Sequence, residues 1–261
     1  MLFKTNKDFT VTYPLKEADV IFVGIPFSFG SVSSKSNYGP LMIRESFKKM
    51  EDYTDKGNIF EELKICDVGD IEVVYGSYKK TQENITDAIK EIKKKNKDAF
   101  IVFMGGNHLI SLPICESLEP KTTVQLDAHA DLRKDYKGSK YMQQTWAYHL
   151  HKKENVNLIQ IGLRSLNKQE QKYKNKNKIE NKLKNLEKPI HLTIDMDVFD
   201  PSYVKTGLPE PDGMNPKEVF QILNKINPES MDIVEISDNS LPSKTGFLAG
   251  KCILKVLENK M

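Results

Sequence analysis

Short apolar runs alternate with amphipathic segments along the whole chain of 261 residues. The apolar runs are rich in β-branched residues and nearly continuous, which is typical of strands buried on both faces of a parallel sheet. The segments between them space their apolar residues as helices do. The alternation predicts an α/β fold, in which one domain spanning residues 1–261 has three α/β/α layers around a mainly parallel sheet. The predicted strands are Val20–Phe27, Ala99–Met104, Thr122–Leu126, Leu158–Leu163, His191–Met196 and Met231–Ile236, and the predicted helices are Pro40–Met50, Thr81–Lys95, Pro216–Ile226 and Thr245–Leu257.

Composition and charge narrow the class of protein. No apolar run reaches the roughly 18–20 residues of a membrane span, and the first residues lack the pattern of a signal peptide. We therefore expect a cytoplasmic protein without a membrane partner. The net charge of +3 is too balanced to favour a nucleic-acid partner.

Three further features are interpreted as structural. The basic excess gathers in Lys168–Lys188, which we interpret as a solvated helix face with a flexible approach. The cysteines Cys66, Cys115 and Cys252 have neither metal-binding nor disulfide spacing, so reduced structural thiols are expected. The single tryptophan, Trp146, is interpreted as helix packing.

Acidic and imidazole side chains follow three of the predicted strands. They are His108 after the first, Asp127, His129 and Asp131 after the second, and Asp195 and Asp197 after the third. Parallel strands end at one sheet edge, where ligands bind, and residues i and i+2 of an extended segment face the same way. Two histidines and four carboxylates suffice for two divalent ions that share carboxylates. The donor set suits Mn²⁺ better than the thiolate-rich sites of zinc, although the affinity series allows other metals.

Several motifs resemble those of the ureohydrolases, the family of arginase, agmatinase and formimidoylglutamase. GGNHLIS, DAHADLRKDY and TIDMDVFDPSY are similar to the three metal-binding segments of the family and occur in the same order. GIPF, YGPLMIRE and IGLRS add further matches, so the resemblance covers nearly the whole chain. It implies the arginase-like form of the three-layer fold and a homo-oligomer, either a trimer or a hexamer.

Carried onto this chain, the resemblance implies two Mn²⁺ ions. One ion would take His108, Asp127, Asp131 and Asp195, and the other Asp127, His129, Asp195 and Asp197, with Asp127 and Asp195 as the bridges. The family uses a metal-bridging hydroxide to attack the guanidinium carbon, which releases urea and an amine. Asp131 matches the aspartate that holds the hydroxide and passes its proton to the leaving amine. Glu235 matches the glutamate that pairs with the guanidinium.

Within the family, DLRKDYKGSKY and TGLPEPDGM most resemble agmatinases. Arginases instead place Asn and Ser after the aspartate-histidine motif to bind the α-amino and carboxylate groups, and this chain has Leu132-Arg133-Lys134 there. We therefore expect hydrolysis of agmatine to putrescine and urea. Guanidinobutyrate, guanidinopropionate or arginine are alternatives within the same chemistry. A metal-binding ureohydrolase-fold protein without turnover is the alternative outside it.

Two residues depart from the family pattern. Asn107 replaces an aspartate beside the predicted ligand His108. Gln143 stands where agmatinases keep a histidine that shuttles protons or lines the substrate, and glutamine carries no proton near neutral pH. We therefore expect weak but measurable activity. His149 and His151 follow on one predicted helix, as surface or capping histidines or as a displaced shuttle.

Overall fold

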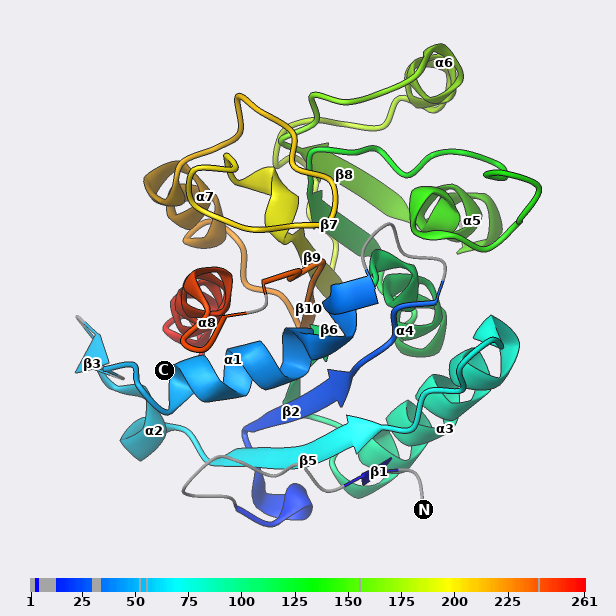
Figure 1. Ribbon diagram of the computed structural model, residues 1–261. Helices are drawn as coiled ribbons and strands as arrows, with labels where there is room; N and C mark the ends of the chain where they lie inside the picture. The colour runs from blue at the N-terminus through cyan, green and yellow to red at the C-terminus, as the bar shows by residue number, and fades with distance from the viewer. Residues whose placement is uncertain are drawn as a thin grey trace.

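Seven parallel strands and one short antiparallel edge strand form the central sheet in the computed structural model (Figure 1). The structure describes residues 3–4, 13–29, 34–51, 53–54, 56–154, 156–238 and 240–261. The strand order is β1-β5-β2-β6-β10-β9-β7-β8, with β1 antiparallel to β5. The strands are β1 (Phe3–Lys4), β2 (Val20–Ile25), β5 (Ile65–Ile71), β6 (Phe100–Gly105), β7 (Thr122–Leu126), β8 (Asn157–Ile161), β9 (Ile190–Asp195) and β10 (Ser230–Val234). The predicted mainly parallel α/β sheet is confirmed.

Helices cover both faces of this sheet, which gives the three predicted layers (Figure 1). On one face lie α1 (Gly39–Phe47), α7 (Pro216–Leu223) and α8 (Lys244–Leu257), and on the other lie α3 (Tyr78–Lys95), α4 (Ser111–Leu118) and α5 (Trp146–Glu154). The remaining α-helices and strands among the described residues are α2 (Ile59–Glu62), α6 (Lys168–Asn177) and the two-stranded sheet of β3 (Tyr53–Thr54) and β4 (Gly57–Asn58). Pro40 stands in the first turn of α1, where its missing N–H costs no hydrogen bond.

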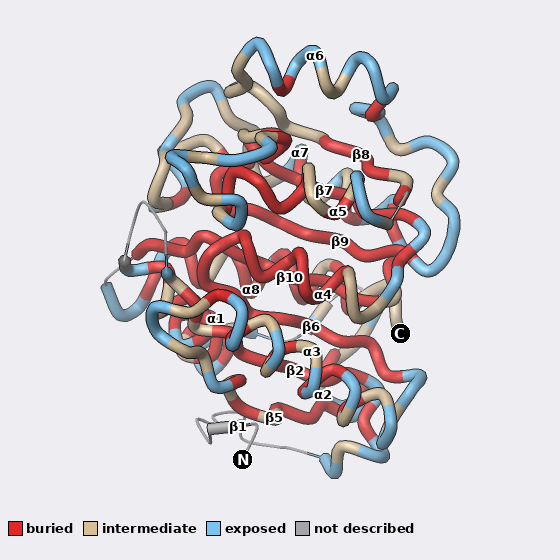
Figure 2. The backbone as a smooth tube through the Cα atoms, turned by 90° about the vertical axis from the view of Figure 1, so that its right-hand side faces the viewer, coloured by how far each residue is buried: buried red, intermediate tan, exposed pale blue. Residues whose placement is uncertain are grey.

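A separate apolar core lies on each face of the sheet. In β2, Val20 and Phe22 enter the core beneath α1 and α8, whereas Ile21 and Val23 enter the core beneath α3 and α4. Because both faces are covered, strand residues of both parities are buried, as the continuous red tubes of the central strands show in Figure 2. This double burial explains why these strands are nearly continuous apolar runs in the sequence.

The strand β5 is the main element that the apolar pattern did not predict. Its sequence, ICDVGDI, contains Asp67, which is fully buried, and Asp70. Arg44 of α1 neutralises both: its Nε lies 2.7 Å from Asp67 Oδ2 and its Nη1 lies 2.6 Å from Asp70 Oδ1. A strand whose charges are compensated by a distant residue cannot be recognised from its own apolar pattern.

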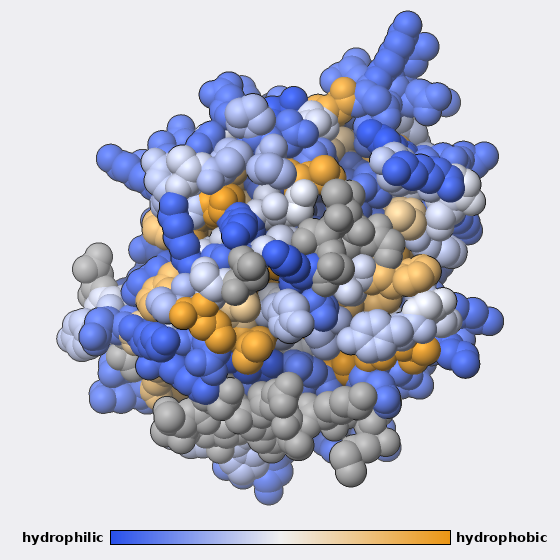
Figure 3. Space-filling model, in the orientation of Figure 1, coloured by the Kyte–Doolittle hydropathy of each residue, from blue (hydrophilic) through white to orange (hydrophobic). Residues whose placement is uncertain are grey.

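The segments that we interpreted as structural are placed as follows. The helix α6 covers the first part of Lys168–Lys188, and Lys178 ends it in a left-handed conformation before an irregular stretch. Hydrophilic side chains dominate this part of the surface, at the top of the view in Figure 3. The three cysteines are buried thiols, as predicted. Among the described residues, no helix has both the length and the apolar character needed to cross a membrane.

The strand order brings four carboxyl ends together. β6, β10, β9 and β7 are consecutive neighbours, all parallel, and each is followed by residues of the predicted site. The loop after β6 also packs tightly against the end of β2. Gly106 donates its N–H to Ile25 O over 3.0 Å, and a Cβ at Gly106 would lie 2.1 Å from Phe27 O. Only glycine permits this close approach, which fixes the start of the His108 segment.

Candidate metal centre

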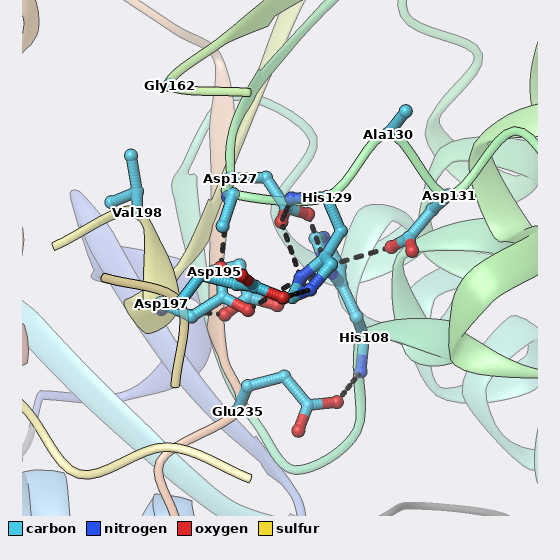
Figure 4. Close-up of polar contacts among 12 residues, drawn as sticks. His108, Asp127, His129, Ala130, Asp131, Gly162, Asp195, Asp197, Val198 and Glu235 are labelled. Atoms are coloured by element: carbon cyan, nitrogen blue, oxygen red, sulfur yellow. Dashed lines mark hydrogen bonds and ion pairs between the residues drawn. The ribbon is translucent and has the colours of Figure 1, made fainter. Parts of the chain in front are cut away.

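The predicted ligands converge beyond the ends of β6, β7 and β9, and Glu235 joins them from β10 (Figure 4). His108 opens the 3₁₀ turn that follows β6. Asp127, His129 and Asp131 follow β7, while Asp195 ends β9. Every one of these side chains is buried except that of His129, which is one-fifth exposed.

The first group of donors surrounds the Nδ1 atom of His108. This nitrogen lies 3.1 Å from Asp127 Oδ2, 3.1 Å from Asp195 Oδ2 and 3.5 Å from Asp131 Oδ2. His108, Asp127 and Asp131 each offer one ligand atom, and these atoms lie within 4.8 Å of one another. Such a spacing fits a single cation.

The second group surrounds the Nδ1 atom of His129. This nitrogen lies 2.8 Å from Asp197 Oδ2 and 3.7 Å from Asp127 Oδ1. Asp127, His129 and Asp197 form a second set of ligand atoms within 4.8 Å of one another. Asp127 belongs to both sets through its two oxygens, so the geometry places it between two candidate cation positions.

The backbone reaches this arrangement differently from the simple alternation that we expected. Asp131 has a left-handed backbone with φ of +52°, so it does not continue the extended segment of Asp127 and His129. Asp197 lies in the 3₁₀ turn Met196–Val198, and its N–H donates to Asp195 Oδ1 over 2.8 Å. The assumed extended backbone is therefore not kept at Asp131 and Asp197, where local turns direct the side chains into the site, while Asp127 and His129 contribute to one donor set.

Charge accumulates in this buried cluster. Burial raises the pKa values of Asp131 and Asp195 well above the ordinary range, and neighbouring carboxylates raise them further. Burial opposes protonation of His129, but hydrogen bonds to Asp127 and Asp197 outweigh it and raise the His129 pKa to about 12. Carboxylates forced together in a site of low dielectric constant are relieved by a bound cation. The donors are oxygen and imidazole atoms, so the cluster fits divalent ions of the Mn²⁺ type.

Glu235 lies across the cavity from the ligand cluster (Figure 4). Its Oε1 accepts a hydrogen bond from the backbone N–H of His108 over 3.0 Å, and its own N–H donates to Gly106 O over 2.8 Å. Its φ of +63° is rare for a residue with a side chain and costs about 1 kcal/mol or more. Burial raises the pKa of Glu235 to about 7. A strained, buried carboxylate facing a cavity is typical of a functional group rather than of packing.

The same small cavity receives Gln143 and Gln144 from the 3₁₀ turn Gln143–Thr145 that precedes α5. Both side chains are buried, and Gln143 accepts a hydrogen bond from Asn107 Nδ2 over 3.2 Å. The Gln144 Oε1 atom has no hydrogen-bond partner among the described residues. Gln143 therefore lines the same cavity as the predicted ligands and Glu235.

The two downstream histidines do not line this cavity. His149 Nε2 lies 3.1 Å from the carbonyl oxygen of Lys134, and His151 Nδ1 lies 3.0 Å from the hydroxyl of Tyr173. Both are partly buried on α5. These contacts favour the structural interpretation over a displaced proton shuttle.

Trp146 does more than pack its helix. It is fully buried, its ring lies 4.7 Å from the ring of His108 between centroids, and its Nε1–H donates to Asp131 Oδ2 over 2.8 Å. The interpretation as packing alone was therefore incomplete, because the indole donates a hydrogen bond to the predicted ligand Asp131 and packs against the predicted ligand His108.

Two more residues that sequence reasoning did not single out support the ligands. Glu210 Oε1 lies 3.3 Å from His129 Nε2, on the side of the ring away from the cluster. Arg164 donates to the carbonyl oxygens of Asp197 at 2.6 Å and Glu210 at 2.8 Å, which ties the loops after β8 and β9 together. Glu210 lies in TGLPEPDGM and Arg164 lies in IGLRS, two motifs that resemble the family. The sequence therefore marked both segments but did not indicate what these two side chains do.

The fold and the site together define a class: an α/β protein with a buried His/Asp cluster, able to bind metal, at the carboxyl ends of its parallel strands. The chain belongs to the arginase family, whose family model matches residues 18–258. The expected family membership is therefore confirmed.

Individual relatives agree with this assignment. The chain is 32% identical to a protein named agmatinase from Pyrococcus horikoshii, with 98% of each sequence covered. It is also 32% identical to the N(1)-aminopropylagmatine ureohydrolase of Thermococcus kodakarensis, with 95% of this chain and 94% of that protein covered. The solved structure of the agmatine ureohydrolase of Thermoplasma volcanium superposes with a TM-score of 0.78 at 22% identity, covering 99% of this chain and 95% of that one. At that identity the third likeness supports the fold alone.

Proposed function

We propose that this protein is a manganese-dependent amidinohydrolase that converts agmatine and water to putrescine and urea. One observation carries the proposal: a strained carboxylate, Glu235, faces two overlapping sets of metal-type donors across one small cavity. A planar guanidinium cation bound by this carboxylate would be held beside the donors. The geometry suits hydrolysis at the guanidinium carbon.

The two ions would be held by the residues of the two donor sets. His108, Asp127 and Asp131 contribute to one and Asp127, His129 and Asp197 to the other. Asp195, close to His108 Nδ1, is the proposed second bridge. Two divalent ions in such a site activate water and polarise the group that it attacks.

The protein side chains have separate roles in this proposal. Glu235 orients the guanidinium through charge-assisted hydrogen bonds, which are about twice as strong as neutral ones. Asp131 accepts a proton and passes it to the leaving amine, with its Oδ2 held by Trp146. Gln143 lines the cavity as a neutral hydrogen-bonding group. Its lack of a titratable proton is the reason that we propose weak activity.

Agmatine is favoured by the names of the relatives and by the segment after Asp131. Leu132 has a buried, apolar side chain. It therefore cannot bind an α-carboxylate as the corresponding polar residue of arginases does. The Thermococcus relative is named for an aminopropyl derivative of agmatine, which makes that longer compound the second candidate. Both candidates lack the carboxylate of arginine.

A homo-oligomer, trimer or hexamer, is proposed from the family resemblance. Light scattering during size-exclusion chromatography measures it: the mass would be three or six times the 29.9 kDa of one chain. A monomer at micromolar concentration would contradict this part of the proposal.

The proposed activity is tested by measuring urea release from agmatine, N(1)-aminopropylagmatine, guanidinobutyrate, guanidinopropionate and arginine. The protein is stripped with a chelator and reloaded with Mn²⁺. We expect urea from agmatine only after reloading. Equal rates in stripped and reloaded protein would contradict the metal dependence, and no urea from any compound would support the alternative of a metal-binding protein without turnover.

A further inference from the structure

A row of polar side chains crosses the sheet one layer below the metal centre. It consists of Gln160 of β8, Gln125 of β7, Thr193 of β9 and Asp232 of β10, which are paired in register from strand to strand. All four side chains are fully buried. Buried polar groups are costly unless they are hydrogen-bonded, so such a row requires a reason.

One end of the row supports Asp127. Gln125 Nε2 donates to Asp127 Oδ2 over 2.7 Å, and Gln160 Nε2 donates to Gln125 Oε1 over 2.8 Å. The other end supports His108. The Nε2 atom of that ring lies 2.9 Å from Thr193 Oγ1, on the side of the ring opposite to the Nδ1 atom that faces the carboxylates.

At the His108 end of the row, the chemistry of the groups fixes the direction of each hydrogen bond. The Thr193 hydroxyl donates its only proton to Asp232 Oδ1 over 2.6 Å. Thr193 must therefore accept from His108, which requires a proton on His108 Nε2. The Nδ1 atom is then the one that offers a lone pair to a metal ion.

The chain of contacts continues beyond Asp232. Its second oxygen, Oδ2, lies 2.9 Å from His191 Nε2, and His191 Nδ1 lies 2.8 Å from Ser230 Oγ. His191 pairs with Ser230, and Thr193 with Asp232, directly across β9 and β10. Both oxygens of the Asp232 carboxylate thus have partners, although it is fully buried.

We propose that Thr193, Asp232 and His191 are positioning residues, which act through His108 to hold one metal ion. The inference rests on the proposed metal binding. Partners on the far side of a ligating histidine fix its orientation and tautomer, and their loss typically lowers metal affinity about 10–100-fold. The effect is specific to one ion, because His129 is held from outside the sheet by Glu210, whose side chain is one-third exposed.

The test is a titration of the full-length protein with Mn²⁺ alone, with the free ion measured by electron paramagnetic resonance. Thr193→Val keeps the shape of the side chain and removes the hydroxyl, and Thr193→Ser keeps the hydroxyl. We expect the Val variant to bind one ion about 10–100-fold more weakly and to keep the other. The Ser variant should retain both affinities.

His191 is tested in the same way. His191→Leu leaves Asp232 Oδ2 without its partner, so the same ion should bind more weakly, with a smaller change than in Thr193→Val. His191→Gln can still donate a hydrogen bond and should restore most of the affinity. Unchanged binding in His191→Leu would overturn the role of His191.

Two controls separate this inference from a general loss of stability. Glu210→Gln should weaken the ion at His129 instead. Asp67→Asn disturbs an equally buried carboxylate in β5 and should destabilise the protein without changing either affinity. If the unaltered protein binds two ions and Thr193→Val binds both as tightly, the positioning role is contradicted while the proposed metal binding stands. If the unaltered protein binds no Mn²⁺, the inference falls together with the proposed metal binding.

Discussion

The side-chain amide of Asn107 donates a hydrogen bond to the side-chain oxygen of Gln143 over 3.2 Å. These are the two residues at which the chain departs from the family pattern, and the structure shows that they are in direct contact. Asn107 Oδ1 is engaged with the N–H of Leu109 at 2.8 Å, so its NH₂ group is the part that meets Gln143. A neutral pair thus stands where the resemblance implies an aspartate and a histidine.

This contact sharpens the prediction for Gln143→His. A histidine supplies a proton carrier near neutral pH, so turnover should rise about tenfold or more. The gain should appear as the new imidazole titrates near its reference pKa of about 6.5. Steady-state rates from pH 5.5 to 9 measure it. Gln144→His, one residue along and also lining the cavity, is the matched control and should give no such gain.

Because Asn107 and Gln143 are in contact, we expect the effects of substitutions at these two residues to be coupled. In Asn107→Asp with Gln143→His, a carboxylate beside the imidazole would orient it, so the double variant should exceed the product of the single effects. A double-mutant cycle on kcat measures the coupling. Strictly additive effects would show that the contact has no role in turnover. A native rate already near 10 s⁻¹, typical of enzymes, would show that Gln143 is an adaptation rather than a defect.

Asp127→Asn should remove both metal ions, because Asp127 belongs to both donor sets. Asp195→Asn is expected to do the same if it is the second bridge. Elemental analysis of protein purified with Mn²⁺ should fall from about two ions per chain to none. Retention of two ions in either variant would contradict the bridging role of that residue.

Glu235→Gln should reduce kcat/KM for agmatine about 10–100-fold, which corresponds to the loss of one charged hydrogen bond. The amide oxygen can still accept from the His108 N–H, so the fold and both metal ions should be retained. Steady-state kinetics and metal analysis are the two measurements. An unchanged kcat/KM would exclude Glu235 as the partner of the guanidinium.

Arg44→Ala should destabilise the protein by about 3–5 kcal/mol, because it leaves the buried Asp67 carboxylate without its cation. Urea unfolding followed by circular dichroism measures the loss. Lys48→Ala is the matched control on the same side of the sheet. It removes a partly exposed ion pair with Glu45 and should cost less than about 1 kcal/mol.

The sequence predicted elements whose own residues form a continuous apolar run, and it failed where a distant residue compensates a charge or sets a turn. The apolar runs predicted six of the seven longer strands, with ends displaced by up to two residues. β5 was not predicted, because the ion-pair partner of its buried Asp67 is Arg44, which lies in another element. The DAHAD motif predicted the ligands, but not the left-handed turn at Asp131 or its bond to Trp146, which tertiary packing decides. The extent of the single domain, 1–261, and the role of each site residue stay predictions.

We propose that the cavity accepts a guanidino compound without an α-carboxylate and hydrolyses it. The most direct test compares kcat/KM for agmatine and arginine in the same preparation of Mn²⁺-loaded protein, with urea as the measured product. We expect a clear preference for agmatine, since Leu132-Arg133-Lys134 replaces the carboxylate-binding run of arginases. A preference for arginine would contradict this proposal.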